Sequence, residues 1–185
     1  MKKITILGTG YVGLVSGAGI SDFGNQVICA DIIKEKIKSL RNGKIPIYEP
    51  GLEELVNKNV DVGRLSFTSN IDAAIQQAEV IFIAVGTPEA EDGTADISAV
   101  ESVARVIGKN INGYKVIFTK STVPVGTGKL ITKIINETKN SKYEFDYVSN
   151  PEFLREGSAV KDFLWPDMVV IGASNDKAFE VMKEV

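Results

Sequence analysis

Short apolar runs rich in β-branched residues alternate along this chain with longer segments whose apolar residues recur at helical spacing. Because strands and helices repeat with different periods, the runs predict strands and the segments predict helices. The expected strands are residues 3–7, 26–30, 65–68, 80–85, 115–120, 145–149 and 168–171. The expected helices are residues 12–23, 34–42, 51–57, 70–78, 97–109, 127–138 and 178–185.

This alternation indicates an α/β fold, a doubly wound parallel sheet with helices on both faces. Residues 80–85 are apolar at every position, as a central parallel strand requires. Two successive strand–helix–strand halves are expected, the second beginning near Val116. With 44% hydrophobic residues, the 185-residue chain is one domain with a sizeable core. Its last residues show no helix stop signal, which favours a fragment of a longer protein.

Composition narrows the classes of function. The 21 basic and 24 acidic residues give a net charge of −3, which disfavours nucleic-acid binding. No apolar run is long enough for a membrane span. The single cysteine excludes an internal disulfide and suits the reducing cytoplasm, where we expect the protein. Because the chain contains no histidine, we expect no metal site, and acid–base chemistry falls to Glu, Asp, Lys, Tyr, Thr or bound water.

Residues 8–13 read Gly-Thr-Gly-Tyr-Val-Gly, directly after the first strand and opening the first helix. In a Rossmann-type dinucleotide-binding domain, Gly8 permits the tight turn and Gly10 lets the backbone approach a pyrophosphate. Gly13 then allows close packing of helix on strand. The unpaired N–H groups of the helix N-terminus face the phosphates. The alternative is a glycine-rich turn that serves packing alone.

Asp31 ends the second strand, eighteen residues after Gly13. A carboxylate there accepts hydrogen bonds from the adenosine ribose and repels a 2′-phosphate, which favours NAD over NADP as the cofactor. Lys34 and Lys36 lie close enough to soften this discrimination. The alternative is that Asp31 serves only a turn or a helix cap.

Three more segments place polar residues where strands are expected to end. They are residues 85–88, Val-Gly-Thr-Pro, residues 120–128, Lys-Ser-Thr-Val-Pro-Val-Gly-Thr-Gly, and residues 150–157, Asn-Pro-Glu-Phe-Leu-Arg-Glu-Gly. Ligands of doubly wound sheets bind at this edge. The third segment mixes two carboxylates with aromatic, aliphatic and basic side chains, which a purely structural loop rarely needs.

Together with residues 45–52, Ile-Pro-Ile-Tyr-Glu-Pro-Gly-Leu, and Pro166-Asp167, these motifs resemble the N-terminal NAD-binding domain of the nucleotide-sugar dehydrogenases that act on UDP- and GDP-sugars. The resemblance covers nearly all of the chain. Residues 91–96 and 157–159 look more like the UDP-glucose branch than the GDP-mannose branch.

The resemblance implies oxidation of the C6 alcohol of UDP-glucose to the carboxylate of UDP-glucuronate with two NAD⁺, a reaction of polysaccharide biosynthesis. The family's nucleophilic cysteine, catalytic lysine, central helix and C-terminal catalytic domain lie outside these residues, so this portion alone is expected to be inactive. The full chain is expected to be a homodimer and the fragment a monomer. Cys29, inside a strand, is expected to be a core residue.

The family pattern also assigns site residues. It makes Thr122 a catalytic residue that positions water or the reacting oxygen, with Glu156 as its acid–base partner. Because a threonine hydroxyl is a poor base, Glu156 is the better proton acceptor; the alternative is a helix-initiating acid. The substrate contacts would be Glu152, Phe153, Leu154, Arg155 and Glu156. The NAD contacts would be Gly8, Gly10, Tyr11, Val12, Gly13, Asp31, Lys36, Gly86, Thr87, Ser121, Thr122 and Glu156.

Other functions remain open at this point. The substrate of the full protein is alternatively UDP-N-acetylmannosamine or GDP-mannose. A stand-alone NAD-binding regulatory module is a further alternative. A one-step dehydrogenase complete within these residues is disfavoured, because the chain has neither a histidine nor an obvious Tyr-x-x-x-Lys pair.

Overall fold

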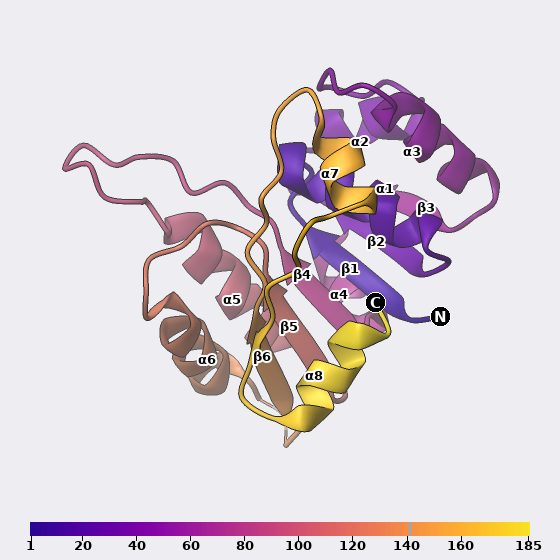
Figure 1. Ribbon diagram of the computed structural model, residues 1–185. Coiled ribbons are helices and arrows are strands. Elements are labelled where there is room, and N and C mark those ends of the chain that lie inside the picture. The colour runs from indigo at the N-terminus through magenta and orange to yellow at the C-terminus, as the bar shows by residue number, and fades with distance from the viewer. Residues whose placement is uncertain (141) are drawn as a thin grey trace.

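The computed structural model describes residues 1–140 and 142–185, which form a seven-stranded sheet covered by helices on both faces (Figure 1). The strand order is β3-β2-β1-β4-β5-β6-β7. The strands are β1 (Lys3–Leu7), β2 (Gln26–Ala30), β3 (Leu65–Thr68), β4 (Val80–Ile83), β5 (Lys115–Thr119), β6 (Phe145–Ser149) and β7 (Gly172–Ala173). The helices are α1 (Tyr11–Asp22), α2 (Lys34–Arg41), α3 (Leu52–Asp61), α4 (Ile71–Gln77), α5 (Ser98–Asn110), α6 (Thr127–Thr138), α7 (Ala159–Leu164) and α8 (Asp176–Lys183).

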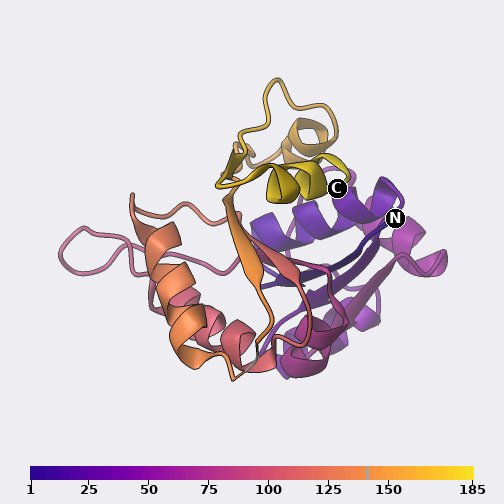
Figure 2. The ribbon, with the colours of Figure 1, turned by 90° about the horizontal axis from the view of Figure 1, so that it is seen from below.

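The apolar core has two layers, one on each face of the sheet. On one face α1 packs against α3 and α7, and the layer beneath them includes Ile6, Leu14 and Phe82. On the other face α4, α5 and α6 cover a layer that includes Ile81 and Ile117. Figure 2 shows α1, α7 and α8 on the side of the sheet opposite α5 and α6. The strands therefore bury both faces, which explains why their sequences are apolar runs.

The single cysteine lies within the first of these layers. Cys29 is fully buried in β2, and a Cβ on Gly17 of α1 would lie 2.3 Å from its sulfur. The absence of a side chain at Gly17 thus lets α1 approach the sheet closely. Burial raises the pKa of the Cys29 thiol to about 12. This matches the expected core role and does not suit a nucleophile.

The doubly wound α/β fold is confirmed, with corrections near its C-terminal end. The predicted strand 168–171 is wrong: the seventh strand is only Gly172–Ala173, it pairs antiparallel with β6, and Met168 and Val169 are exposed. Helix α7 was not predicted, because six residues are too few to show helical periodicity. The second half of the sheet begins at β4 with Val80 and not near Val116, since the chain crosses there from β3 to the far side of β1.

Two strands are shorter than expected, because the chain turns away at the sheet edge. Strands β4 and β5 end at Ile83 and Thr119.

None of the helices in the described residues combines the length and hydropathy of a membrane span.

Candidate functional site

The glycine loop, residues 8–13, lies where β1 and β4 sit side by side and the strand order reverses direction. Ligands of doubly wound sheets bind at such a switch point. Gly8 has a φ of +105°, and a Cβ there would lie 2.6 Å from the carbonyl oxygen of Ala84. Its N–H donates to the Ala30 carbonyl at 2.8 Å. Both the conformation and the contacts therefore require glycine at this turn.

The start of α1 has the features of a phosphate-binding helix terminus. Gly10 is the N-cap and provides no side-chain hydrogen bond, so N–H groups of the first turn remain available. A Cβ on Gly10 would meet no atom within 4 Å, which leaves open space against the backbone. A Cβ on Gly13 would lie 2.0 Å from the Gly8 carbonyl oxygen. Tyr11 and Val12, which are both half-buried, lie between Gly10 and Gly13 at the start of α1. The loop thus fits a pyrophosphate.

Asp31 lies at the tip of β2 and binds the glycine loop directly. Its Oδ2 accepts hydrogen bonds from the Thr9 N–H at 3.0 Å and the Thr9 hydroxyl at 2.7 Å. Its Oδ1 accepts from the Ile33 N–H at 3.0 Å, just before α2. Lys36 donates to Oδ2 at 3.1 Å. Asp31 therefore makes the turn contacts of the structural alternative and also stands beside the proposed dinucleotide site.

The charge of Asp31 follows from these contacts. Burial acts to raise the pKa of its carboxyl, but the hydrogen bonds from Thr9, Ile33 and Lys36 outweigh that effect and hold the pKa below its ordinary value. The site therefore carries a fixed negative charge at neutral pH. Such a charge repels a 2′-phosphate, and the ion pair with Lys36 neutralises it in part.

The loops after β4 and β5 are linked to each other at the same edge of the sheet. The Thr87 hydroxyl donates to the Thr122 carbonyl at 2.9 Å, and the Ser121 hydroxyl donates to the Val85 carbonyl at 2.6 Å. Gly86 and the Thr122 side chain are exposed. The structure thus brings together four of the residues that the sequence assigns to cofactor contact.

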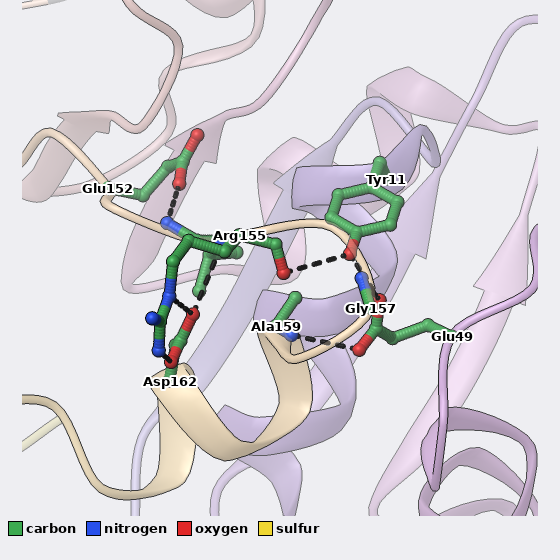
Figure 3. A network of polar contacts seen from close by, with 8 residues as sticks. Tyr11, Glu49, Glu152, Arg155, Gly157, Ala159 and Asp162 are labelled. Carbon is green, nitrogen blue, oxygen red and sulfur yellow. Dashed lines mark hydrogen bonds and ion pairs between the residues drawn. The ribbon is translucent and has the colours of Figure 1, made fainter.

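The segment 150–157 follows β6 and passes in front of α1 (Figure 3). Glu152 accepts from the Leu154 N–H at 2.5 Å. The Arg155 guanidinium forms two hydrogen bonds with Asp162 of α7, at 3.0 and 2.6 Å, and lowers the pKa of that carboxyl to about 2. Phe153 is exposed. The Arg155 charge is therefore already paired within the protein.

The two residues predicted to be catalytic are both exposed at this edge. Within the described residues no hydrogen bond joins Thr122 to Glu156, which precedes the turn at Gly157. Their partnership stays a prediction. Glu156 lies three residues before the first residue of α7, so it does not act as a cap inside that helix.

Glu49 is the site residue that the sequence analysis missed. It lies between α2 and α3, is almost fully buried, and accepts hydrogen bonds from the Tyr11 hydroxyl and from the N–H groups of Gly157 and Ala159 (Figure 3). Glu49 was part of the motif at residues 45–52 that contributed to the family resemblance, but no role was assigned to it. The signal that could have identified Glu49 was therefore its place in a family motif, since nothing in its residue type or spacing indicated a buried acceptor.

A cavity of about 580 Å³ lies beside the segment 150–157. Its walls include Lys120, Asn150, Glu152, Leu154 and Phe163. Burial lowers the pKa of Lys120 to about 8, against the opposing effect of the Glu152 carboxylate. Within the described residues the buried Oδ1 of Asn150 has no hydrogen-bond partner. The volume is within the usual range for small-molecule pockets.

Comparison with known proteins settles the family. Residues 2–185 match the model of the UDP-glucose/GDP-mannose dehydrogenase family, NAD binding domain. The chain belongs to this family. It is 54% identical over 185 residues to the UDP-glucose 6-dehydrogenase TuaD of Bacillus subtilis (strain 168), covering 100% of this chain and 40% of that protein. It is 53% identical over 186 residues to a UDP-glucose 6-dehydrogenase of Rhizobium meliloti (strain 1021), covering 99% and 42%.

Two solved structures of nucleotide-sugar dehydrogenases are also similar to this chain in fold and sequence. A UDP-glucose dehydrogenase from the hyperthermophilic archaeon Pyrobaculum islandicum superposes with a TM-score of 0.96 at 41% identity, covering 100% of this chain and 43% of that one. A GDP-mannose dehydrogenase from Pseudomonas aeruginosa gives 0.94 at 37% identity, covering 98% and 43%. The family, the Rossmann-type fold and the NAD-binding character expected from the sequence are thereby confirmed. The chain spans about two fifths of the length of these relatives.

Proposed function

We propose that this domain serves an enzyme that oxidises the C6 alcohol of UDP-glucose to the carboxylate of UDP-glucuronate. The observation that carries the proposal is the meeting of two segments at the switch point: Glu49 joins Tyr11 of the glycine loop to Gly157, next to Glu156. The names of the two relatives described above support UDP-glucose as the sugar nucleotide. The conversion requires water and two NAD⁺, and releases two NADH and three protons.

The residues present fit NAD. The first turn of α1 offers unpaired N–H groups to a pyrophosphate, with open space over Gly10, and Asp31 offers a carboxylate to the adenosine ribose. Gly86, Thr87, Ser121 and Thr122 would line the nicotinamide end. When bound, NAD⁺ accepts the hydride that leaves the sugar carbon.

The chain's own residues would prepare the sugar for that transfer. Glu156, exposed beside the site, would accept the proton of the C6 hydroxyl or of an attacking water, and the Thr122 hydroxyl would orient the reacting oxygen. Glu152, Phe153, Leu154 and Arg155 would contact the nucleotide sugar. Cys29 does not serve as the nucleophile, since its thiol is buried beneath Gly17. A thioester step would need a cysteine outside these residues.

Calorimetric titration of the 185-residue chain with NAD⁺ and, separately, NADP⁺ tests the cofactor assignment. We expect saturable NAD⁺ binding and little NADP⁺ binding. Titrations in which neither nucleotide binds would overturn the assignment of the glycine loop for this chain.

The substrate is tested on the full-length protein with UDP-glucose, GDP-mannose and UDP-N-acetylmannosamine. We expect UDP-glucose to be oxidised fastest, with two NADH formed per sugar. One NADH per sugar would contradict the two-step reaction. Absence of turnover with every sugar would favour a regulatory NAD-binding module.

The proposal extends to the setting of the reaction. We place it in the cytoplasm, in polysaccharide biosynthesis, with a full-length homodimer and a monomeric isolated domain. Light scattering after size-exclusion chromatography measures both masses. A dimeric 185-residue chain would contradict the expectation that the contacts forming the dimer lie outside it.

A further inference from the structure

Glu49 connects three parts of the chain that are remote in sequence. Its Oε2 accepts hydrogen bonds from the Tyr11 hydroxyl and, at 2.8 Å, from the Gly157 N–H. Its Oε1 accepts from the Ala159 N–H at 2.8 Å. Figure 3 shows the carboxylate between the Tyr11 ring and the start of α7. One buried side chain thus bonds both to the glycine loop and to the end of the segment 150–157.

The remaining polar contacts of residues 151–159 are mostly internal. Glu152 bonds to Leu154, and Arg155 bonds to Asp162 of the adjoining helix. Within the described residues, the hydrogen bonds that tie residues 151–159 to more distant segments run to Glu49 and Tyr11. Two side chains therefore supply the polar contacts that hold this segment at the glycine loop, beside the apolar packing of Leu154 and Ala159 on the core.

A carboxylate is the side chain that this position requires. All three partners are donors, and an ionised carboxylate has only acceptors. Burial acts to raise the pKa of Glu49, but the bonds from Tyr11, Gly157 and Ala159 outweigh it and keep the group ionised. A glutamine would retain one acceptor and turn an N–H toward the remaining donors. The glutamine variant is therefore nearly isosteric but mismatched.

We propose that Glu49 is a positioning residue, which holds the segment 150–157 against the glycine loop so that NAD bound at that loop orders the segment for the nucleotide sugar. The inference rests on the proposed function. Tyr11 is the first residue of α1, directly after the N-cap Gly10. A dinucleotide that restrains this turn also restrains Tyr11, Glu49 and the two amides bonded to it.

Amide hydrogen exchange on the 185-residue chain, with and without NAD⁺, tests this proposal. We expect the Gly157 and Ala159 amides of the unmodified chain to exchange more slowly when NAD⁺ is bound. In Glu49→Gln these amides should exchange at least about tenfold faster than in the unmodified chain, and NAD⁺ should no longer slow them. Tyr48→Ala is the matched control, because it alters the adjacent, 91% exposed side chain and should change neither result.

The outcomes separate this inference from the function on which it rests. Failure of the unmodified chain to bind NAD⁺ in calorimetry would count against the proposed function. Binding of NAD⁺ without slower exchange at Gly157 and Ala159, or Glu49→Gln amides that exchange at the original rate, would overturn the role of Glu49 alone. If Glu49→Gln does not fold, Tyr11→Phe decides, since it removes one hydroxyl and should abolish the NAD⁺-dependent slowing.

A kinetic measurement on the full-length enzyme distinguishes positioning from general stability. Glu49→Gln should raise the KM for the nucleotide sugar by a larger factor than the KM for NAD⁺. Equal effects on both, or an effect on kcat alone, would contradict the proposal.

Discussion

The Asp31 carboxylate accepts hydrogen bonds from both the backbone N–H and the hydroxyl of Thr9, the second residue of the glycine loop. The residue expected to select the cofactor thus also fixes the loop that would bind its pyrophosphate. Cofactor choice and loop geometry are consequently linked through one buried side chain, and substitutions at the two positions should separate these roles.

Asp31→Ala is expected to weaken NAD⁺ binding and to relax discrimination against NADP⁺. The substitution removes both the ribose acceptor and the negative charge, and it frees Lys36 from its ion pair. Calorimetry with the two nucleotides measures the ratio of affinities. Thr9→Val, which removes only the hydroxyl donor, should weaken NAD⁺ binding less and preserve the preference. Unchanged affinities in Asp31→Ala would leave Asp31 a purely structural residue.

Gly10→Ala should change the stability of the fold little, whereas Gly13→Ala should lower it strongly. A Cβ on Gly10 meets no atom within 4 Å, so stability should change by less than about 1 kcal/mol while NAD⁺ affinity falls. A Cβ on Gly13 collides with the Gly8 carbonyl oxygen, so the free energy of unfolding should fall by about 3 kcal/mol, the upper end of the range for overpacking substitutions. Urea denaturation measures the free energy of unfolding of each variant, and calorimetry measures its NAD⁺ affinity. Full NAD⁺ affinity in Gly10→Ala would contradict close approach of the pyrophosphate.

Glu156→Gln in the full-length enzyme should reduce kcat by about 100-fold or more, a far larger factor than the loss of NAD⁺ affinity. Glutamine keeps the size of the side chain and removes its ability to accept a proton. Steady-state kinetics and calorimetry measure the two quantities. Turnover equal to that of the unmodified enzyme would exclude Glu156 as the proton acceptor.

Lys120 should make stability depend on pH. Burial lowers its pKa in the folded chain to about 8, below the ordinary value of 10.5, so the folded state binds fewer protons between these pH values. The free energy of unfolding should therefore gain a contribution that rises with pH from 8 to 10.5, at about 1.4 kcal/mol per unit of pKa shift. Below pH 8 the buried ammonium lowers stability in full.

Urea denaturation of Lys120→Met and the unmodified chain across that range measures this contribution as a difference. The variant should be the more stable of the two near pH 7, and the difference should shrink as the pH rises. Lys129→Met, at an exposed position of α6, is the control and should show no such trend. A difference that stays constant with pH would contradict the lowered pKa.

The glycine loop and Asp31 were predictable from sequence because their partners are close along the chain or lie on adjacent strands. The strand ending at Leu7, the turn at Gly8 and the helix beginning at Tyr11 form one local unit. Its spacing follows from backbone geometry, whatever the rest of the fold does. The central apolar strands were also predicted from local sequence, although β4 and β5 end earlier than expected, at Ile83 and Thr119.

The contacts of Glu49 were not predictable in this way. Its partners Gly157 and Ala159 lie 108 and 110 residues further along the chain, and a hydrogen bond to a backbone N–H depends little on the identity of the donor residue. Residues 168–171 were mistaken for a strand because an apolar run does not reveal which neighbour it pairs with. The Asn150 amide instead bonds to the Val170 carbonyl at 2.8 Å, and pairing with β6 starts only at Gly172.

Because Gly17 of α1 packs closely on Cys29, the reactivity of the Cys29 thiol should report movement of α1 away from the sheet. Thiol reagents react with the thiolate, and the Cys29 sulfur is buried with a raised pKa. Alkylation therefore requires a local opening in which α1 moves away from the sheet. The helix that lifts is the one that carries the glycine loop at its start. The rate of Cys29 alkylation therefore measures local opening of the nucleotide-binding half without an added label. A ligand that binds at the glycine loop should slow the alkylation.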